Sequence, residues 1–348
     1  MSEPTDYHSL AWLLERLSLM PGISGHEDLI ARALADHFAP YAAAVRIDPL
    51  ANVIAHFDGA AESPRVAVLA HIDTVGLLVN RYHSDGTLGV VAVGGVNLAA
   101  LPGTPVRVGE HPGVITVRAQ HLARSDDAIP PIEAIAIRVG VDPAAVEITT
   151  PVLYATQPAV LGDLYTGPYL DNRGGCAVLV ELARRLAESP PPYPVDLIGT
   201  VQEETTCAGA NSVLHALRPD AAIFVDGTLS YDARDVQHLG PVRLGHGPVL
   251  TSFLYVSGLN GWHAHPGLRA HLKQVAADHD IPFQQDAVRG LISDARVAGW
   301  LGIPSAIIGL PLEAKHAPYE IAHLGDLAHA VDLLLAVLHA PLPDLARG

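Results

Sequence analysis

The chain has 348 residues, with 37 Asp and Glu against 21 Lys and Arg, so its formal net charge is −16 when histidine is neutral. This balance argues against a nucleic-acid-binding protein, because phosphate contacts need clustered cationic side chains. Hydrophobic residues make up 49% of the chain and charged residues only 17%, so there is enough apolar surface to offset the entropy of ordering a globular fold.

The sequence also argues against a membrane-spanning or disulfide-stabilised protein. No uninterrupted apolar run approaches the roughly 18 to 20 residues that a membrane-spanning helix needs. Segment 1–6 lacks the basic and apolar regions of a signal peptide. The two cysteines, Cys176 and Cys207, are too few for a disulfide framework or a thiolate zinc site, whereas 19 histidines could supply metal ligands. We expect a soluble cytoplasmic protein with no membrane partner and no nucleic-acid partner.

The N-terminal segment predicts two helices followed by two strands. Residues 7–20 carry leucines at helical spacing. Ser24 and Glu27 have the spacing of a capping box at the start of a second amphipathic helix. Strands are expected at 51–57 and 65–71. The second of these is too apolar to alternate, so we predict that it is covered on both faces.

The pattern changes between residues 75 and 165. Short β-type stretches are separated there by Gly, Pro and Asp, and no long helical pattern is present. This pattern of short strands and turns is typical of a small β-barrel or sandwich. The expected strands are 89–93, 105–108, 113–118 and 146–155.

After residue 165 the sequence alternates between helix and strand patterns. Helices are expected at 173–188, 209–217, 268–279, 294–301 and 324–339, and strands at 195–202, 221–225, 249–256 and 305–310. The simplest architecture is an α/β domain interrupted by an all-β insertion. We expect the α/β domain to comprise 1–74 plus 166–348, and the insertion to comprise 75–165.

Polar side chains collect at the ends of the apolar strands and at one helix start. Because open α/β sheets bind ligands at the carboxyl ends of their strands, these side chains should meet in one crevice. Two imidazoles and several carboxylates in one place suit a divalent metal such as Zn, Co or Mn. The residues are His71, Asp73, Asp171, Glu203, Glu204, Asp226 and His316.

Spacing suggests roles for two pairs of these residues. His71 and Asp73 can face the same side of a strand, so His71 could bind metal while Asp73 accepts its other N–H. One of Glu203 and Glu204 could bind metal while the other acts as general base. Consecutive strand residues point to opposite faces, so this division requires the chain to turn at Glu203.

Each of these residues also has an ordinary structural alternative when taken singly. His71 fits a hydrogen-bonded core histidine, Asp171 fits a helix N-cap, and Asp226 fits the start of a turn. The glutamate pair fits a solvated strand end, and His316 is one of 19 histidines. The metal-site hypothesis therefore depends on all the positions jointly.

Six stretches, in a fixed order over nearly the whole chain, carry a resemblance to a known family. They are 21–27 (PGISGHE), 70–79 (AHIDTVGLLV), 169–177 (YLDNRGGCA), 200–204 (TVQEE), 225–228 (VDGT) and 311–320 (PLEAKHAPYE). The sequence resembles the tetrahedral (TET-type) di-metal aminopeptidases, which include glutamyl, leucyl and deblocking aminopeptidases and some proteins with an older endoglucanase label. The resemblance implies a phosphorylase/hydrolase-like mixed-sheet catalytic domain with an inserted barrel-like domain.

The resemblance also implies a cofactor and a role for each site residue. Two divalent metal ions are expected per subunit, with zinc favoured and cobalt or manganese as alternatives. Asp171 would bridge the metals, His71 and Asp226 would complete one site, and Glu204 and His316 the other. Glu203 would be the general base and Asp73 would orient His71. The bond between Asp171 and Asn172 matches a position that related enzymes often hold as a cis peptide.

The implied reaction is metal-dependent removal of N-terminal residues from peptides with a free N-terminus. A water shared by the metals would lose a proton to Glu203 and attack the peptide carbonyl. The resemblance further implies a homo-oligomer built from dimers, which could be as large as a dodecamer.

Thr74 and the stretches 205–210 and 312–315 depart from the family pattern near the substrate. With only Lys273 and Lys315 as lysines, the chain leans toward neutral or apolar substrates.

Two alternatives remain open. The runner-up enzyme is a metallo-carboxypeptidase or N-acyl amino acid deacylase of the related di-metal group, but in that group the extra domain follows the later ligands. Here the β-type insertion falls between His71 and Asp171, which favours the aminopeptidase. The other alternative is a non-catalytic metal-binding scaffold, against which the retention of Glu203 beside a full ligand set argues.

Overall fold

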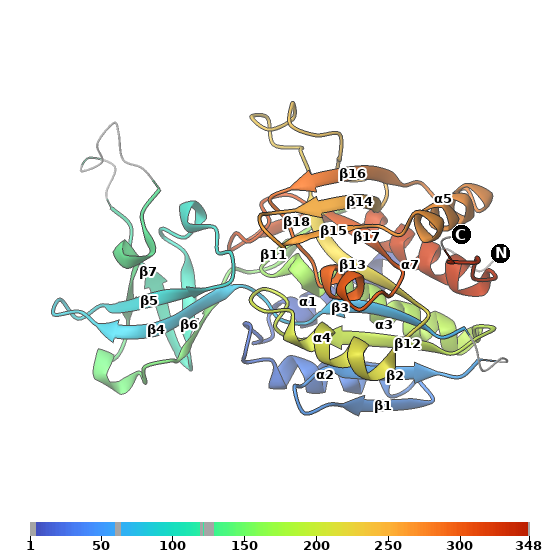
Figure 1. Cartoon of the computed structure of the whole chain (residues 1–348). Helices are drawn as coiled ribbons and strands as arrows, with labels where there is room; N and C mark the ends of the chain where they lie inside the picture. Colours follow the sequence, from blue (N-terminus) through green and yellow to red (C-terminus); the bar gives the residue numbers. More distant parts are fainter. Residues whose placement is uncertain (1–4, 60–63, 119–120, 122–128, 347–348) are drawn as a thin grey trace.

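The computed structural model describes residues 5–59, 64–118, 121 and 129–346. Figure 1 shows a larger α/β part and a small β-barrel to one side of it, with both chain termini on the side of the α/β part away from the barrel. This is the mixed-sheet α/β fold with an all-β insertion that the sequence predicts, and the expected fold class is confirmed.

One mixed sheet of nine strands forms the centre of the α/β part. Its order is β1-β2-β12-β3-β13-β17-β14-β15, and β16 also pairs with β14. The strands are β1 (Ala44–Ile47), β2 (Val53–Phe57), β3 (Val66–His71), β12 (Val195–Thr200), β13 (Ala221–Leu229), β14 (Val249–Tyr255), β15 (Gly261–His263), β16 (Gln284–Arg289) and β17 (Ser305–Leu312). The central strands β12, β3, β13 and β17 run parallel to one another.

Helices cover both faces of this sheet, and they are α1 (Tyr7–Ser18), α2 (Asp28–Phe38), α3 (Leu170–Glu188), α4 (Ala208–Leu217), α5 (Pro266–Asp278), α6 (Ala295–Trp300) and α7 (Leu324–His339). Every residue of β3 is buried, as predicted for 65–71. Val66 and Val68 pack in the core that contains α1, α2, α3, α5 and α7. Ala67 and Leu69 pack in the core with α4 and α6 on the other face.

The barrel is closed by six antiparallel strands in the order β4-β5-β8-β7-β6-β9. They are β4 (Gly76–Tyr82), β5 (Leu88–Val93), β6 (Pro105–Val108), β7 (His111–Ile115), β8 (Ala136–Val139) and β9 (Pro151–Tyr154). The strands expected at 89–93 and 105–108 are confirmed. The one expected at 113–118 starts and ends earlier, and only the second half of 146–155 is a strand.

A separate three-stranded sheet joins the segment after the barrel to the C-terminal part of the chain. It pairs β10 (Ala159–Leu161), β11 (Leu164–Gly167) and β18 (Glu320–His323). The barrel strands therefore end at Tyr154, before the expected limit of the insertion at 165. The domain division at 74/75 and 165/166 stays a prediction.

The capping box predicted at Ser24 and Glu27 is wrong. Helix α2 has Glu27 itself at the N-cap position, with no side-chain cap hydrogen bond. The Ser24 hydroxyl instead lies 2.8 Å from the Thr205 hydroxyl. Glu27 Oε1 accepts the backbone N–H of Gly25 at 2.8 Å and of Gln202 at 3.1 Å. Tertiary contacts to the segment after β12 thus replace the local capping interaction.

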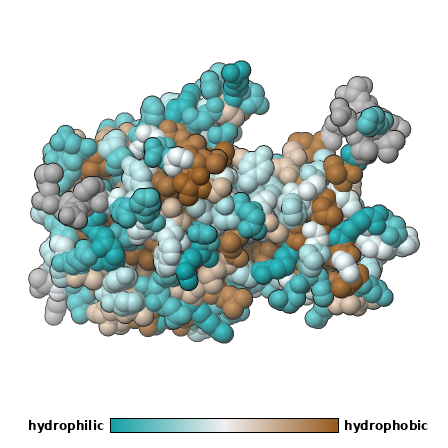
Figure 2. Space-filling view, turned by 180° about the vertical axis from the view of Figure 1, so that it is seen from behind, coloured by the Kyte–Doolittle hydropathy of each residue, from teal (hydrophilic) through white to brown (hydrophobic). Residues whose placement is uncertain are grey.

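Within the described residues, no helix is both long enough and apolar enough to span a bilayer. Figure 2 shows that the surface behind the view of Figure 1 is mainly hydrophilic, with one patch of apolar side chains on the larger part and further apolar side chains on the smaller part.

Candidate active site

The parallel strands bring the predicted polar residues to one edge of the sheet. His71 is the last residue of β3 and lies opposite Thr200, the last residue of β12. Asp226 lies within β13 rather than after it, opposite Gly309 of β17. His316 follows the end of β17 by four residues. The expected convergence at the carboxyl ends of the strands is therefore present.

The chain turns at Glu203, as the sequence predicts. Strand β12 ends at Thr200, and residues 203–206 form a turn. The carboxylate of Asp73 accepts the backbone N–H of Glu203 at 2.9 Å and of Glu204 at 3.1 Å. Asp73 is fully buried, so one carboxylate fixes the backbone of both glutamates.

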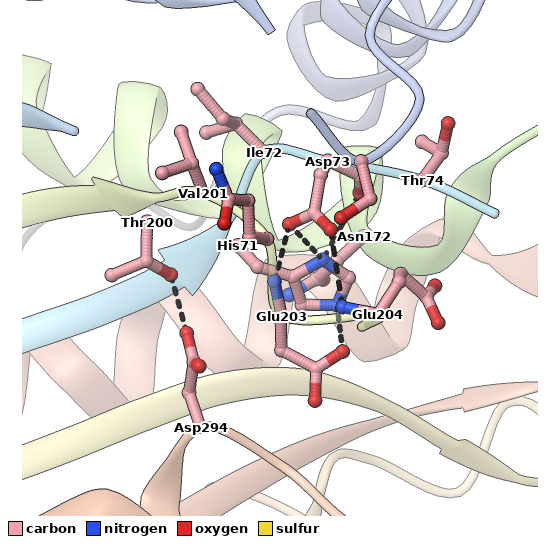
Figure 3. Close-up of polar contacts among 12 residues, drawn as sticks. His71, Ile72, Asp73, Thr74, Asn172, Thr200, Val201, Glu203, Glu204 and Asp294 are labelled. Atoms are coloured by element: carbon pink, nitrogen blue, oxygen red, sulfur yellow. Dashed lines mark hydrogen bonds and ion pairs between the residues drawn. The ribbon is translucent and has the colours of Figure 1, made fainter. Parts of the chain in front are cut away.

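His71 lies among three carboxylates. Its Nε2 atom is 3.3 Å from Asp171 Oδ1, 3.5 Å from Asp226 Oδ1 and 3.8 Å from Glu203 Oε2. Figure 3 shows the imidazole ring between Asp73 and Glu203. All these side chains are less than 10% exposed, with 9% the largest value at Asp226. This is one compact, buried group of metal-competent atoms.

His316 makes the corresponding group on the other side of Asp171. Its Nε2 atom is 3.1 Å from Asp171 Oδ2 and 3.5 Å from Glu204 Oε1. Its Nδ1 is 2.7 Å from the carbonyl oxygen of Gly95, which can only accept, so Nδ1 donates and Nε2 is left free to bind a cation. The two carboxylate oxygens of Asp171 therefore face two different histidines.

Three buried carboxylate oxygens in this cleft have no hydrogen-bond partner among the described residues. They are Asp171 Oδ1, Glu204 Oε1 and Asp226 Oδ1. Buried anionic oxygens are costly unless a cation or donor compensates them. Ligand atoms within 4.8 Å of one another form the groups His71–Asp171–Asp226, Asp171–Glu204–His316 and His71–Glu203–Glu204. Mixed imidazole and carboxylate donors fit a divalent metal such as zinc, cobalt or manganese.

Burial and charge shift the pKa values of the acids in this cleft. Burial raises the pKa of Glu203 well above its ordinary value; His71 lowers that pKa, and the neighbouring carboxylates Asp226 and Glu204 raise it further. Burial likewise raises the pKa of Glu204 to about 7. A carboxyl group with a raised pKa can exchange protons near neutral pH, which general acid–base catalysis requires.

The two histidines are shifted by the same carboxylates. Burial alone would lower the pKa of His71, but Glu203, Asp171 and Asp226 outweigh it and raise that pKa well above its ordinary value. The pKa of His316 rises to about 9 against the effect of burial, chiefly through Asp171. The cleft thus attracts positive charge strongly.

Two local contacts differ in detail from what the spacing suggested. His71 Nδ1 lies 3.1 Å from the carbonyl oxygen of Asp73, while the carboxylate of Asp73, which holds the glutamate backbone, lies at 3.6 Å. At the start of α3 the capping oxygen comes from Asn172, whose Oδ1 accepts the N–H of Gly175, and not from Asp171. The Asp171–Asn172 peptide bond is cis, as the resemblance implied.

Two residues of the site were missed from the sequence. Lys315 Nζ lies 2.6 Å from Asp171 Oδ2, and the buried carboxylate of Glu320 accepts the backbone N–H groups of Asp171 and His316. A signal was present for both, because Lys315 is one of only two lysines and Glu320 follows His316 by four residues.

The sequence matches the M42 glutamyl aminopeptidase family over residues 51–333. The chain belongs to the M42 peptidase family. It is 32% identical over 349 residues to a lysyl aminopeptidase of Pyrococcus furiosus, covering 95% of this chain and 97% of the relative. The resemblance stated from the six stretches is therefore confirmed.

Solved structures of aminopeptidases agree with the assignment of this chain to the M42 family. An aminopeptidase from the archaeon Desulfurococcus kamchatkensis matches with a TM-score of 0.90 at 26% identity, over 96% of this chain and 95% of that chain. A Pyrococcus horikoshii TET1 peptidase, which can assemble into a tetrahedron or a large octahedral shell, matches with a TM-score of 0.83 at 26% identity, over 94% and 98%. This M42 protein is an aminopeptidase, and M42 aminopeptidases are metal-dependent.

Proposed function

We propose that the chain binds two divalent metal ions in this cleft, with zinc favoured and cobalt or manganese as alternatives. Asp171 holds both ions, His71 and Asp226 complete one site, and Glu204 and His316 complete the other. The observation that carries this proposal is that Asp171 turns its two carboxylate oxygens toward two different histidines, at 3.3 and 3.1 Å. The unpartnered buried oxygens of Asp171, Glu204 and Asp226 support it.

Glu203 is the general base of the proposed reaction. Divalent ions held by these ligands would polarise the carbonyl of the scissile peptide and lower the pKa of a water molecule. Glu203 accepts a proton from the attacking water and returns it to the leaving nitrogen. Asp73 sets the position of Glu203 through its backbone N–H and orients His71 through its carbonyl oxygen.

The substrate we infer is a peptide with a free N-terminus and a neutral or apolar first side chain. The scarcity of lysine supports this, because the chain has only Lys273 and Lys315, and Lys315 is already paired with Asp171. The relative from Pyrococcus furiosus is named for lysyl substrates, so the side-chain preference needs a direct test.

The test compares leucyl, lysyl and glutamyl p-nitroanilides, each with a free and with an acetylated N-terminus, before and after chelation and after return of Zn, Co or Mn. We expect hydrolysis of the free amines only, led by the leucyl substrate, lost on chelation and restored by metal. Preference for acetylated substrates or for C-terminal cleavage would favour the deacylase or carboxypeptidase alternative. No hydrolysis of any substrate in the metal-loaded protein would favour the non-catalytic scaffold.

We further infer a homo-oligomer built from dimers. The assembly described for the Pyrococcus horikoshii TET1 peptidase supports this inference. Exposed apolar side chains support it too: Trp12 on α1 is 49% exposed and Val160 on β10 is 55% exposed, around a hollow of about 290 Å³. Light scattering on the purified chain would distinguish a monomer, a dimer and a dodecamer. The cytoplasmic location stays a prediction.

A further inference from the structure

We propose that the ammonium group of Lys315 is a fixed cation of this cleft that weakens metal binding to the group Asp171–Glu204–His316. The inference rests on the proposed function, since it concerns the metal affinity of the same site. It also adds a form of regulation: one of the two ions would be held loosely, so metal availability would set the fraction of fully loaded enzyme.

Lys315 is held in the cleft by two contacts. Its Nζ atom lies 2.6 Å from Asp171 Oδ2 and donates to the carbonyl oxygen of Gly227 at 2.9 Å. Its side chain is 10% exposed, so solvent screens its charge only weakly. The lysine approaches from the loop between β17 and β18, directly before His316. The charge is therefore built into the site and does not belong to a mobile surface side chain.

The lysine shares an oxygen with one proposed metal site. Asp171 Oδ2 is the atom that faces His316 Nε2 at 3.1 Å, and the same atom contacts Lys315 Nζ. A divalent cation held by Asp171, Glu204 and His316 would lie near a like charge in a buried environment, where charges interact strongly. Lys315 already supplies part of the positive charge that this carboxylate needs, so the gain from binding metal is smaller.

The other proposed site uses the opposite oxygen of Asp171. His71 faces the opposite oxygen, Asp171 Oδ1, at 3.3 Å, and Asp226 Oδ1 at 3.5 Å. Both of these oxygens lack a hydrogen-bond partner among the described residues, whereas in the His316 group Glu204 Oε1 lacks one and Asp171 Oδ2 contacts Lys315. The ammonium group of Lys315 thus already offsets part of the negative charge in the His316 group and none of the oxygens named for the His71 group. We therefore expect the His71 group to bind metal more tightly than the His316 group.

The experiment is a zinc titration of the metal-free full-length chain, with a competing chelator to report each dissociation constant. Wild type should bind two ions in unequal steps. In Lys315→Met, which keeps an unbranched side chain one atom shorter and removes the charge, the weaker binding step should tighten by about tenfold or more while the stronger step changes less. Lys315→Arg keeps the charge and should retain two unequal steps.

Two further variants serve as controls. Lys273→Met removes the other lysine of the chain, on α5, and should titrate like wild type. Lys315→Gln removes the charge and keeps a hydrogen-bond donor for Asp171, so it tests the proposal even if the methionine variant fails to fold. An unchanged or weakened second step in the neutral Lys315 variants would overturn the proposal, because it would assign the lysine an organising role.

The failure of this inference is distinguishable from failure of the proposed function. If wild type binds two ions and hydrolyses the leucyl substrate, but neutral Lys315 variants bind zinc as wild type does, only the role of Lys315 is wrong. If wild type binds no zinc at either group, both the proposed function and the role of Lys315 are overturned.

Discussion

The carboxylate of Glu320 accepts the backbone N–H of Asp171 at 2.8 Å, although 149 residues separate the two along the chain. Its other oxygen accepts the backbone N–H of His316 at 2.5 Å. The residue is 1% exposed. One buried side chain thus fixes the backbone of two proposed ligands that come from helix α3 and from the loop after β17.

Substitution of Glu320 by glutamine should weaken zinc binding. Glutamine offers one carbonyl oxygen and one amide group, so one of the two backbone N–H groups would lose its acceptor. We expect zinc affinity to fall by about 10- to 100-fold, the usual effect of losing a residue that orients a ligand. A chelator competition assay measures this, with Glu188→Gln as control, since Glu188 is exposed at the end of α3. Equal affinity in both variants would contradict the positioning role.

Substitution of Glu203 by glutamine should separate catalysis from metal binding. The amide cannot accept the proton, so hydrolysis of leucyl p-nitroanilide should fall by about 10²- to 10⁴-fold. Because Glu203 is not a proposed ligand, the zinc content should stay at the wild-type level, whereas Glu204→Gln should lose metal. Elemental analysis beside the activity assay checks both. A glutamine variant that keeps full activity would remove Glu203 from the mechanism.

Chelation should destabilise the folded protein as well as inactivate it. Ligands that bind only the folded state stabilise it by about 3 to 4 kcal/mol at 100 to 1,000 times their dissociation constant. Without cations, the carboxylates around His71 and Asp171 repel one another. We expect EDTA to lower the melting temperature of wild type by more than that of His71→Ala, which keeps only the Asp171–Glu204–His316 group. Equal shifts in both proteins would indicate that the metal binds elsewhere.

The stability of the protein should depend on pH through Glu27. Burial raises the pKa of this residue to about 7, above the value of about 4.3 expected in the unfolded chain. Between these two pKa values the folded state binds more protons than the unfolded chain does. The stability that protonated Glu27 contributes below the unfolded pKa is therefore lost as the pH rises through the folded pKa of about 7.

Substitution of Glu27 by glutamine keeps the Oε1 acceptor for Gly25 and Gln202 and removes the titration. Relative to wild type, we expect the variant to gain about 1 to 2 kcal/mol of unfolding free energy between pH 5 and pH 8. Urea unfolding at both pH values measures the difference, with the exposed neighbour Asp28→Asn as control. Parallel pH profiles for wild type and Glu27→Gln would contradict the assignment.

The sequence predicted best the elements whose pattern is set by burial. The strand at 65–71 and the helix at 324–339 are found where their apolar runs predicted, because both faces of the strand and one long side of the helix are packed. In the barrel, β4 and β8 were not predicted. Strand β8 has only four residues, of which one is buried, so its pattern is weak.

Contacts between distant segments explain the remaining errors. Glu27 has the spacing of a local capping box, yet it accepts the N–H of Gln202, which lies 175 residues away. The carboxylate of Asp73 accepts the backbone N–H groups of Glu203 and Glu204, so the carbonyl oxygen of Asp73 is the nearer acceptor for His71. Residue spacing predicted which side chains would meet, but their hydrogen-bond partners depend on the packing of the complete fold.

The most direct test of the proposed site is anomalous diffraction at the zinc edge from crystals grown with zinc. We predict two zinc peaks, one on each side of Asp171: one zinc bound also by His71 and Asp226, and the other by Glu204 and His316. Zinc bound away from Asp171, or a single ion at saturating zinc that contacts both histidines, would contradict the bridged two-metal site.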